Sequence, residues 1–164
     1  MVDKCAECGF AYDPADIPEV GTRIRESATS TAALLTGDDL HPRRTPEVWS
    51  PLEYACHLRD VFLVLRERFL AIRRRDMRDW TPMGRDERVD HDGYADQAPA
   101  AVARQLLDAA EMFSNVLART PSEDLALIVR YPYPEPTERT LGWVALHTLH
   151  EARHHHLDIT RQLS

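Results

Sequence analysis

Five of the eight histidines lie within fourteen residues near the C-terminus, from Leu146 to Ile159. The segment reads as a helix, because apolar residues recur at helical spacing and neither Gly nor Pro follows Gly142. Residues four apart lie on one face of a helix, so His150 and His154 can direct both imidazoles at one ion. Such a pair on one helix face predicts a metal site.

The other histidines of this segment differ in their relation to that face. His147 lies three residues before His150 and shares much of its face. His155 and His156 are expected to point elsewhere and to be partly solvated. The predicted metal site therefore leaves these two residues out.

A candidate third ligand is His57, which lies inside a separate predicted helix. A lone histidine on an apolar face is more often a hydrogen-bonded core residue, and the pair at His150 and His154 is what favours a metal role here. Zinc sites commonly take three protein ligands and leave one position open. Imidazole nitrogens also suit Ni²⁺ and Fe²⁺, but Zn²⁺ is expected because nothing in the sequence indicates redox chemistry.

A second candidate site is the N-terminal segment Cys5-Ala6-Glu7-Cys8-Gly9. A Cys-x-x-Cys followed by Gly is half of a zinc knuckle, because the turn brings two thiolates to one ion. No second Cys-x-x-Cys exists, so the missing ligands would be His, Asp or Cys56. The alternatives are a structural turn with free thiols and a redox pair, although the strand and helix that a redox pair needs are not evident.

The composition predicts a single soluble domain with a core and a short head. The chain has 164 residues, a hydrophobic fraction of 43%, a charged fraction of 29% and a net charge of -7. The net charge argues against a general nucleic-acid binder. No apolar run is long enough to cross a membrane, and Met1 to Cys5 show no signal segment, so we expect a cytoplasmic protein with reduced thiols. We divide the chain into a Cys-x-x-Cys head, residues 1–18, and a helical domain, residues 19–164.

Four amphipathic helices make an all-α four-helix bundle the expected architecture. The best-defined start is Ser50-Pro51-Leu52-Glu53, which has the N-cap, first-turn proline and glutamate of a capping box. Its basic end, Arg66 to Arg78, is interpreted as a solvated helix end, with an anion-binding patch as the alternative. The four helices are expected over residues 19–36, 51–75, 99–119 and from residue 140 onward. A long loop at 76–98 would join the second and third helices, and a short strand is allowed at 127–131.

Two segments resemble the DinB-like (damage-inducible) metalloprotein superfamily, which includes thiol-dependent S-transferases and mycothiol-dependent maleylpyruvate isomerase. They are Trp49 to Asp60 and His150 to Ile159, and the resemblance extends over residues 19–163. It implies a four-helix bundle of up-down-down-up order, so the connection between the second and third helices would be a crossover. It also implies a metal triad that falls on His57, His150 and His154.

The chemistry implied by the resemblance is activation of a low-molecular-weight thiol, such as mycothiol, by the metal for a transferase or isomerase reaction. Arg59 and Arg153 lie on the helices that carry the ligands and could hold a substrate carboxylate, because Arg binds carboxylates in a bidentate manner. Salt bridges to nearby acids are the alternative. The expected partner is a small-molecule substrate, and a homodimer is left open.

Two other functions remain open at this point. The first is a non-enzymatic metal-binding or stress-response protein, in which Cys5 or Cys8 closes the histidine site. The second is a metalloprotease, because His150-Glu151-Ala152-Arg153-His154 matches His-Glu-x-x-His, with Glu151 as general base. The protease would need a third ligand downstream and a substrate cleft, and neither is evident in the sequence.

Overall fold

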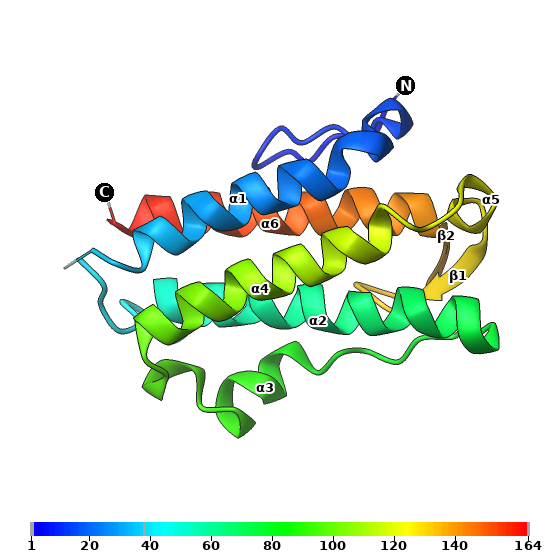
Figure 1. Ribbon diagram of the computed structural model, residues 1–164. Helices are drawn as coiled ribbons and strands as arrows, with labels where there is room; N and C mark the ends of the chain where they lie inside the picture. The colour runs from blue at the N-terminus through cyan, green and yellow to red at the C-terminus, as the bar shows by residue number, and fades with distance from the viewer. Residues whose placement is uncertain (1, 38, 164) are drawn as a thin grey trace.

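The computed structural model describes residues 2–37 and 39–163, and four long helices form its body. They are α1 (Val20–Leu34), α2 (Pro51–Arg75), α4 (Pro99–Leu117) and α6 (Leu141–Leu163). Helices α1 and α2 each pack against both α4 and α6. In Figure 1, α1 and α6 run in one direction and α2 and α4 in the other. The expected up-down-down-up four-helix bundle is confirmed.

Helix α2 begins where the sequence predicts, because its N-cap satisfies backbone groups that would otherwise be unpaired. The Glu53 amide donates to Ser50 Oγ at 3.3 Å, and the Ser50 amide donates to Glu53 Oε2 at 2.7 Å. Arg43 pairs with the same buried carboxylate at 2.8 Å. The helix ends at Asp76, whose φ of 53° is left-handed and breaks the helical repeat. This well-fixed helix carries His57.

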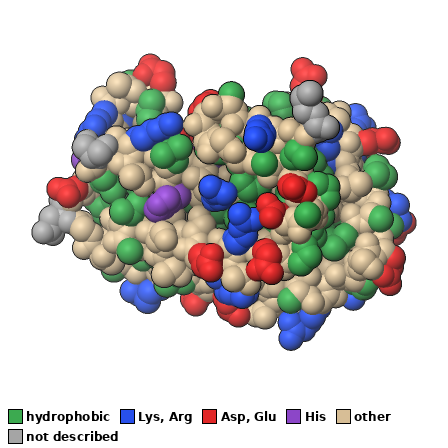
Figure 2. All heavy atoms as spheres, turned by 90° about the horizontal axis from the view of Figure 1, so that it is seen from above, with side chains coloured by type: hydrophobic (Ala, Val, Ile, Leu, Met, Phe, Trp, Pro, Cys, Tyr) green, Lys and Arg blue, Asp and Glu red, His purple; other side chains and the backbone are tan. Residues whose placement is uncertain are grey.

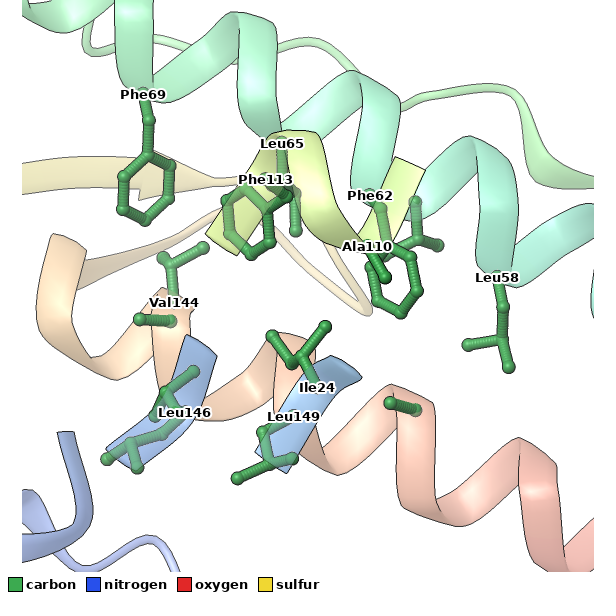
Figure 3. Close-up of a cluster of buried hydrophobic side chains, with 14 of the residues drawn as sticks. Ile24, Leu58, Phe62, Leu65, Phe69, Ala110, Phe113, Val144, Leu146 and Leu149 are labelled. Atoms are coloured by element: carbon green, nitrogen blue, oxygen red, sulfur yellow. The ribbon is translucent and has the colours of Figure 1, made fainter. Parts of the chain in front are cut away.

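The core lies between the four helices and is rich in aromatic side chains (Figure 3). Phe69 and Phe113 meet edge to face, with ring centroids 5.4 Å apart, and Phe62 stacks on the other side of Phe113 at 6.5 Å. Full burial of one such side chain contributes about 1.5–3 kcal/mol. Leu149 of α6 is fully buried in the same cluster, so packing fixes how α6 is rotated about its axis.

The crossover between α2 and α4 is more ordered than the predicted loop at 76–98. It contains α3 (Arg85–His91) and a 3₁₀ turn, η2 (Tyr94–Asp96). Both are held to α2 by the buried carboxylate of Asp60, which accepts hydrogen bonds from Arg88 at 3.0 Å and from Tyr94 at 2.7 Å. Elements this short have too few residues to show a helical period, which explains why the sequence indicated only a loop.

The connection between α4 and α6 forms a short helix and a small hairpin. Helix α5 (Ser122–Leu125) precedes strand β1 (Ile128–Tyr131), which pairs antiparallel with β2 (Thr137–Thr140). The predicted short strand at 127–131 is confirmed as β1. The start of the crossover lies beside this hairpin, because the Arg130 amide donates to the Arg78 carbonyl at 2.8 Å.

The N-terminal head is a small turn structure followed by the 3₁₀ helix η1 (Pro14–Glu19). Lys4 and Ala11 form an antiparallel bridge, and the turn between them uses Gly9 at a φ of 69°. Phe10 is 2% exposed and anchors the head in the core. In Figure 1 the head lies above α1 and α6.

The surface seen from the side of the head carries both signs of charge. Figure 2 shows Lys and Arg side chains interspersed with Asp and Glu rather than gathered into one basic patch. Across the described residues, every helix is too short or too polar to cross a bilayer.

Candidate metal centres

Helix α6 presents ligands on two faces, because consecutive residues are about 100° apart around a helix. On one face, His150 and His154 meet Cys5 and Cys8 of the head, and we name these four residues the cysteine–histidine group. Each of the four residues offers one ligand atom, and these four atoms all lie within 4.8 Å of one another.

On the next face of α6, Glu151 and His155 meet His57 of α2, and we name these three residues the glutamate–histidine group. Among the described residues, His57 therefore falls in a different group from His150 and His154, with which the sequence had combined it. His147 forms a further set with His150 and Glu151. Metal binding by His57, His150 and His154 stays a prediction, but the structure divides these residues between two places.

The glutamate–histidine group is centred on one carboxylate. Glu151 Oε2 lies 3.8 Å from His57 Nε2 and 3.4 Å from His155 Nε2. The other ring nitrogen of His155 lies 2.9 Å from Asp158 Oδ2, which fixes the orientation of that ring. His155 was expected to point elsewhere and to be partly solvated, but its side chain is 15% exposed and faces this group.

The charges in this group fit a cation site. Burial opposes ionisation of Glu151, but the neighbouring imidazoles of His150, His155 and His57 hold its pKa well below the usual value. Burial lowers the pKa of His57, which keeps that imidazole neutral, and its buried Nδ1 has no hydrogen-bond partner among the residues that the structure describes. Burial lowers the pKa of His155, but hydrogen bonds to Asp158 and Glu151 raise it to about 9. In the absence of a metal, a proton on His155 supplies the positive charge that Glu151 attracts.

The donor set also fits zinc chemically. Two imidazoles and one carboxylate form a known catalytic zinc set, in which a fourth position stays open. His57 and Glu151 have pKa shifts toward the forms that bind metal, the neutral imidazole and the carboxylate. His155 would give up its proton on binding, so metal affinity at this group would rise with pH.

A cavity of about 300 Å³ lies beside the glutamate–histidine group. His57 and Glu151 form part of its wall together with His147, whose pKa burial lowers to about 4. The opposite walls come from the crossover and the hairpin, including Tyr131. This size is at the lower end of the range for small-molecule sites.

The two arginines predicted to bind substrate lie away from this cavity. Arg59 is 6% exposed and forms ion pairs with Asp60 at 2.8 Å and Asp92 at 3.0 Å. Arg153 lies over the ring of Phe10, with its guanidinium carbon 5.7 Å from the centroid. Arg59 thus has the salt bridges that the sequence left as the alternative, whereas the contact of Arg153 is with an aromatic ring.

Arg68 and Arg85 line the cavity instead. Arg68 was part of the basic helix end that we interpreted as solvated, yet it packs over Trp80 at 5.2 Å and donates to the Thr81 carbonyl. A signal for it existed in the sequence, because Arg68 follows His57 by three helical turns. Arg85 has no such signal, since the crossover places it.

The His-Glu-x-x-His arrangement does not favour a protease. A zinc protease needs both histidines and the glutamate around one ion. Here Glu151 Oε2 faces His57 and His155. Glu151 Oε1 lies 3.5 Å from His150 Nδ1, but His150 and His154 also face two thiols. With Cys5 and Cys8 the pair makes up four potential ligands, which would leave no position for a substrate.

Comparison with known proteins places this arrangement in a family. Residues 22–159 match the family model of the DinB superfamily. The structure is similar to that of YfiT from Bacillus subtilis, with a TM-score of 0.78 at 14% identity over 90% of this chain and 86% of that chain. YfiT is described as a probable metal-dependent hydrolase with an unusual four-helix bundle topology. No curated protein matches the sequence. Because the family model covers most of its length, this chain belongs to the DinB superfamily.

Proposed function

We propose that this protein is a metal-dependent enzyme whose ion, Zn²⁺ in the first instance, is held by His57, Glu151 and His155. The observation that carries the proposal is the meeting of these three donors at the wall of a cavity. In this proposal Glu151 and His155, rather than His150 and His154, are the two ligands on α6 that join His57, because His150 and His154 face the cysteines. Ni²⁺ and Fe²⁺ suit the same imidazoles.

The residues of the chain have distinct parts in this proposal. The ion, when bound, would lower the pKa of a thiol or water coordinated to it and orient that group. Asp158 holds the ring of His155 through its Nδ1, so that Nε2 faces the centre of the group. His147 stays neutral at pH 7 and borders the same cavity, where it can exchange hydrogen bonds with substrate.

We infer that the cavity binds a small substrate with a carboxylate through its two arginines, although Asp86 and Glu87 also line it. Its apolar wall includes Val61 and Leu65 of α2, and its cationic groups are Arg68 and Arg85. Arginine can bind a carboxylate through two parallel hydrogen bonds. An apolar body with a carboxylate fits these walls, and the electrophilic carbon would lie on the side of the glutamate–histidine group.

The reaction that we favour is transfer or isomerisation with a low-molecular-weight thiol such as mycothiol. In a transferase, the thiol sulfur would form a bond to the electrophilic carbon, the leaving group would depart with the electron pair of its own bond to that carbon, and the thiol proton would pass to solvent. In an isomerase, the sulfur would add to one carbon of a double bond, and the π electrons would move toward the substrate carboxylate. The same sulfur would leave again after rotation about the former double bond. The support for this choice is the family resemblance.

A second candidate is metal-dependent hydrolysis, which the likeness to YfiT favours because that protein is described as a probable metal-dependent hydrolase. Water would then take the place of the thiol beside the same three residues. Arg68 and Arg85 would serve the same purpose in both reactions, so the cavity alone does not separate them.

The test is turnover by untagged, zinc-loaded protein with and without added thiol. Consumption of mycothiol is followed in the presence of an electrophilic carboxylic acid, and ester hydrolysis is followed in its absence. Thiol-dependent turnover that His57→Ala abolishes is the expected result, and hydrolysis without thiol would favour the second candidate. His156→Ala is the matched control, because His156 lies on α6 outside both groups, with its Nδ1 3.0 Å from Thr31 Oγ1.

Absence of both activities in a protein that retains metal at this site would overturn the enzyme proposal. It would favour the non-enzymatic metal-binding function that the sequence left open. Peptide hydrolysis lost in Glu151→Gln with metal retained would favour the protease instead.

A further inference from the structure

We propose that Cys5, Cys8, His150 and His154 form a second, structural Zn²⁺ site that fastens the N-terminal head to α6. This site is separate from the one proposed for catalysis, and its argument does not depend on that function. The four residues come from the two ends of the chain.

The spacing of the ligand atoms carries the first part of the argument. One ligand atom from each residue lies within 4.8 Å of those of the other three, and Cys5 Sγ is 3.7 Å from His154 Nδ1. Zn–S bonds of about 2.3 Å and Zn–N bonds of about 2.0–2.1 Å at tetrahedral angles place sulfur and nitrogen about 3.6 Å apart. An ion would therefore fit with little movement of the side chains.

The backbone of the head has the shape of a metal-binding turn. The Cys5 amide donates to the Phe10 carbonyl at 2.9 Å, and the Gly9 amide donates to the Cys5 carbonyl at 3.0 Å. Gly9 has a φ of 69°, which favours glycine. This turn directs both thiols of the Cys-x-x-Cys segment toward α6.

An independent observation comes from His150, which is 9% exposed. Neither of its ring nitrogens has a hydrogen-bond partner among the described residues, although Glu151 Oε1 lies 3.5 Å from its Nδ1. A buried imidazole without partners costs free energy. A bond from one nitrogen to a metal ion would remove that cost at this nitrogen.

The surroundings of His154 point the same way. Its Nδ1 faces Cys5, and its Nε2 lies 3.4 Å from Glu7 Oε2. Histidines that bind metal usually donate their other ring N–H to a carboxylate, which fixes the tautomer and the orientation. Glu7, between the two cysteines, is in the right place for this part.

Two thiolates and two imidazoles complete a tetrahedral site and leave no open position, which is typical of structural zinc. The site would also fix the aromatic residues of the head. Tyr12 stacks on Trp143 with centroids 5.5 Å apart, and its hydroxyl is 2.9 Å from His147 Nδ1. Since His147 borders the cavity, the structural ion would hold one wall of the proposed active site in place.

The test measures metal content and the Co²⁺ spectrum of the full-length, untagged protein. Co²⁺ bound by thiolates gives a charge-transfer absorption that Co²⁺ bound by histidine and carboxylate lacks. We expect this band in wild type and its loss in Cys5→Ser/Cys8→Ser, with one metal ion fewer per chain. Cys56→Ser is the matched control, because Cys56 is buried beside Gln97 and outside both groups.

The outcomes separate this proposal from the proposed function. Wild-type protein without the thiolate band, or a double variant that keeps the full metal content, overturns the structural site. Loss of one ion in His57→Ala with the thiolate band intact supports both sites as distinct. If His57→Ala keeps all metal and the thiolate band is present, the structural site stands and the catalytic one fails. The band in wild type needs no variant, so the test holds even where the double variant does not fold.

Discussion

The two faces of α6 carry similar ligands but have different neighbours. His150 and His154 face the head, where two thiols approach, whereas Glu151 and His155 face α2, where a single imidazole and a cavity approach. Four donors that would fill a tetrahedral site suit a structural ion, and three donors beside a cavity suit chemistry. The two faces therefore differ less in their own ligands than in the residues that lie opposite them.

Among variants that test the difference between the two faces, His57→Ala is expected to have the largest effect, a loss of turnover and of metal. The glutamate–histidine group would lose a ligand, and its ion with it. Loss of residues that merely support a metal ligand typically costs 10–100-fold in activity, so we expect a loss of at least about 100-fold here. Steady-state turnover and metal content measure it. If turnover survives in the variant, the cavity face is not catalytic.

The next largest effect is expected from Cys5→Ser/Cys8→Ser, and it should appear in stability. An ion bound at a concentration 1,000-fold above its Kd stabilises the native state by about 4 kcal/mol. At about 2–4 °C per kcal/mol, Tm should fall by about 10 °C. Thermal unfolding with and without a chelator measures this. An identical Tm in variant and wild type would contradict a structural ion on the head face.

A matched pair of carboxylate variants would separate the two faces more finely. Asp158→Asn should weaken metal binding at the glutamate–histidine group by about 10–100-fold, because it supports His155 from 2.9 Å. Glu7→Gln should weaken the cysteine–histidine group by a similar factor, because it supports His154 from 3.4 Å. Competition with a coloured chelator measures both affinities. Equal effects of both variants on both groups would mean that the two faces act as one site.

The smallest effect is expected from Arg68→Ala, which removes a cation from the cavity wall. A hydrogen bond to a charged group contributes about 1.5–3 kcal/mol, so KM for an anionic substrate should rise about 10-fold or more with little change in kcat. Arg66→Ala is the control, because Arg66 pairs with Glu67 and lies outside the cavity lining. Equal KM values for the two variants would remove the anion-binding part of the proposal.

Much of the fold could be predicted from the sequence, because the long helices have clear periods and α2 has a capping box. The grouping of the ligands could not. His150 with His154 and Glu151 with His155 have the same four-residue spacing, so helical periodicity treats them alike. The rotation of α6, set by buried residues such as Leu149, decides which pair faces α2. That rotation depends on packing between distant segments, which local patterns do not encode.

The cavity wall was equally hidden from sequence patterns. The crossover contributes Arg85 and the hairpin contributes Tyr131, and neither segment has a period that indicates its position. The single Cys-x-x-Cys did predict that further metal ligands were needed, and histidine was among the expected residue types. The histidines that face it are the pair that had been assigned to the other site.

The contact between the crossover and the hairpin allows the side chains of these connections to change independently of the ligands on the helices. Arg78 and Arg130 join these connections through their backbones, so side chains there can be replaced while the contact persists. The ligands of the glutamate–histidine group lie on α2 and α6 and do not depend on those side chains. Substitutions in the two connections can therefore change the cavity wall while the helices keep the same ligands.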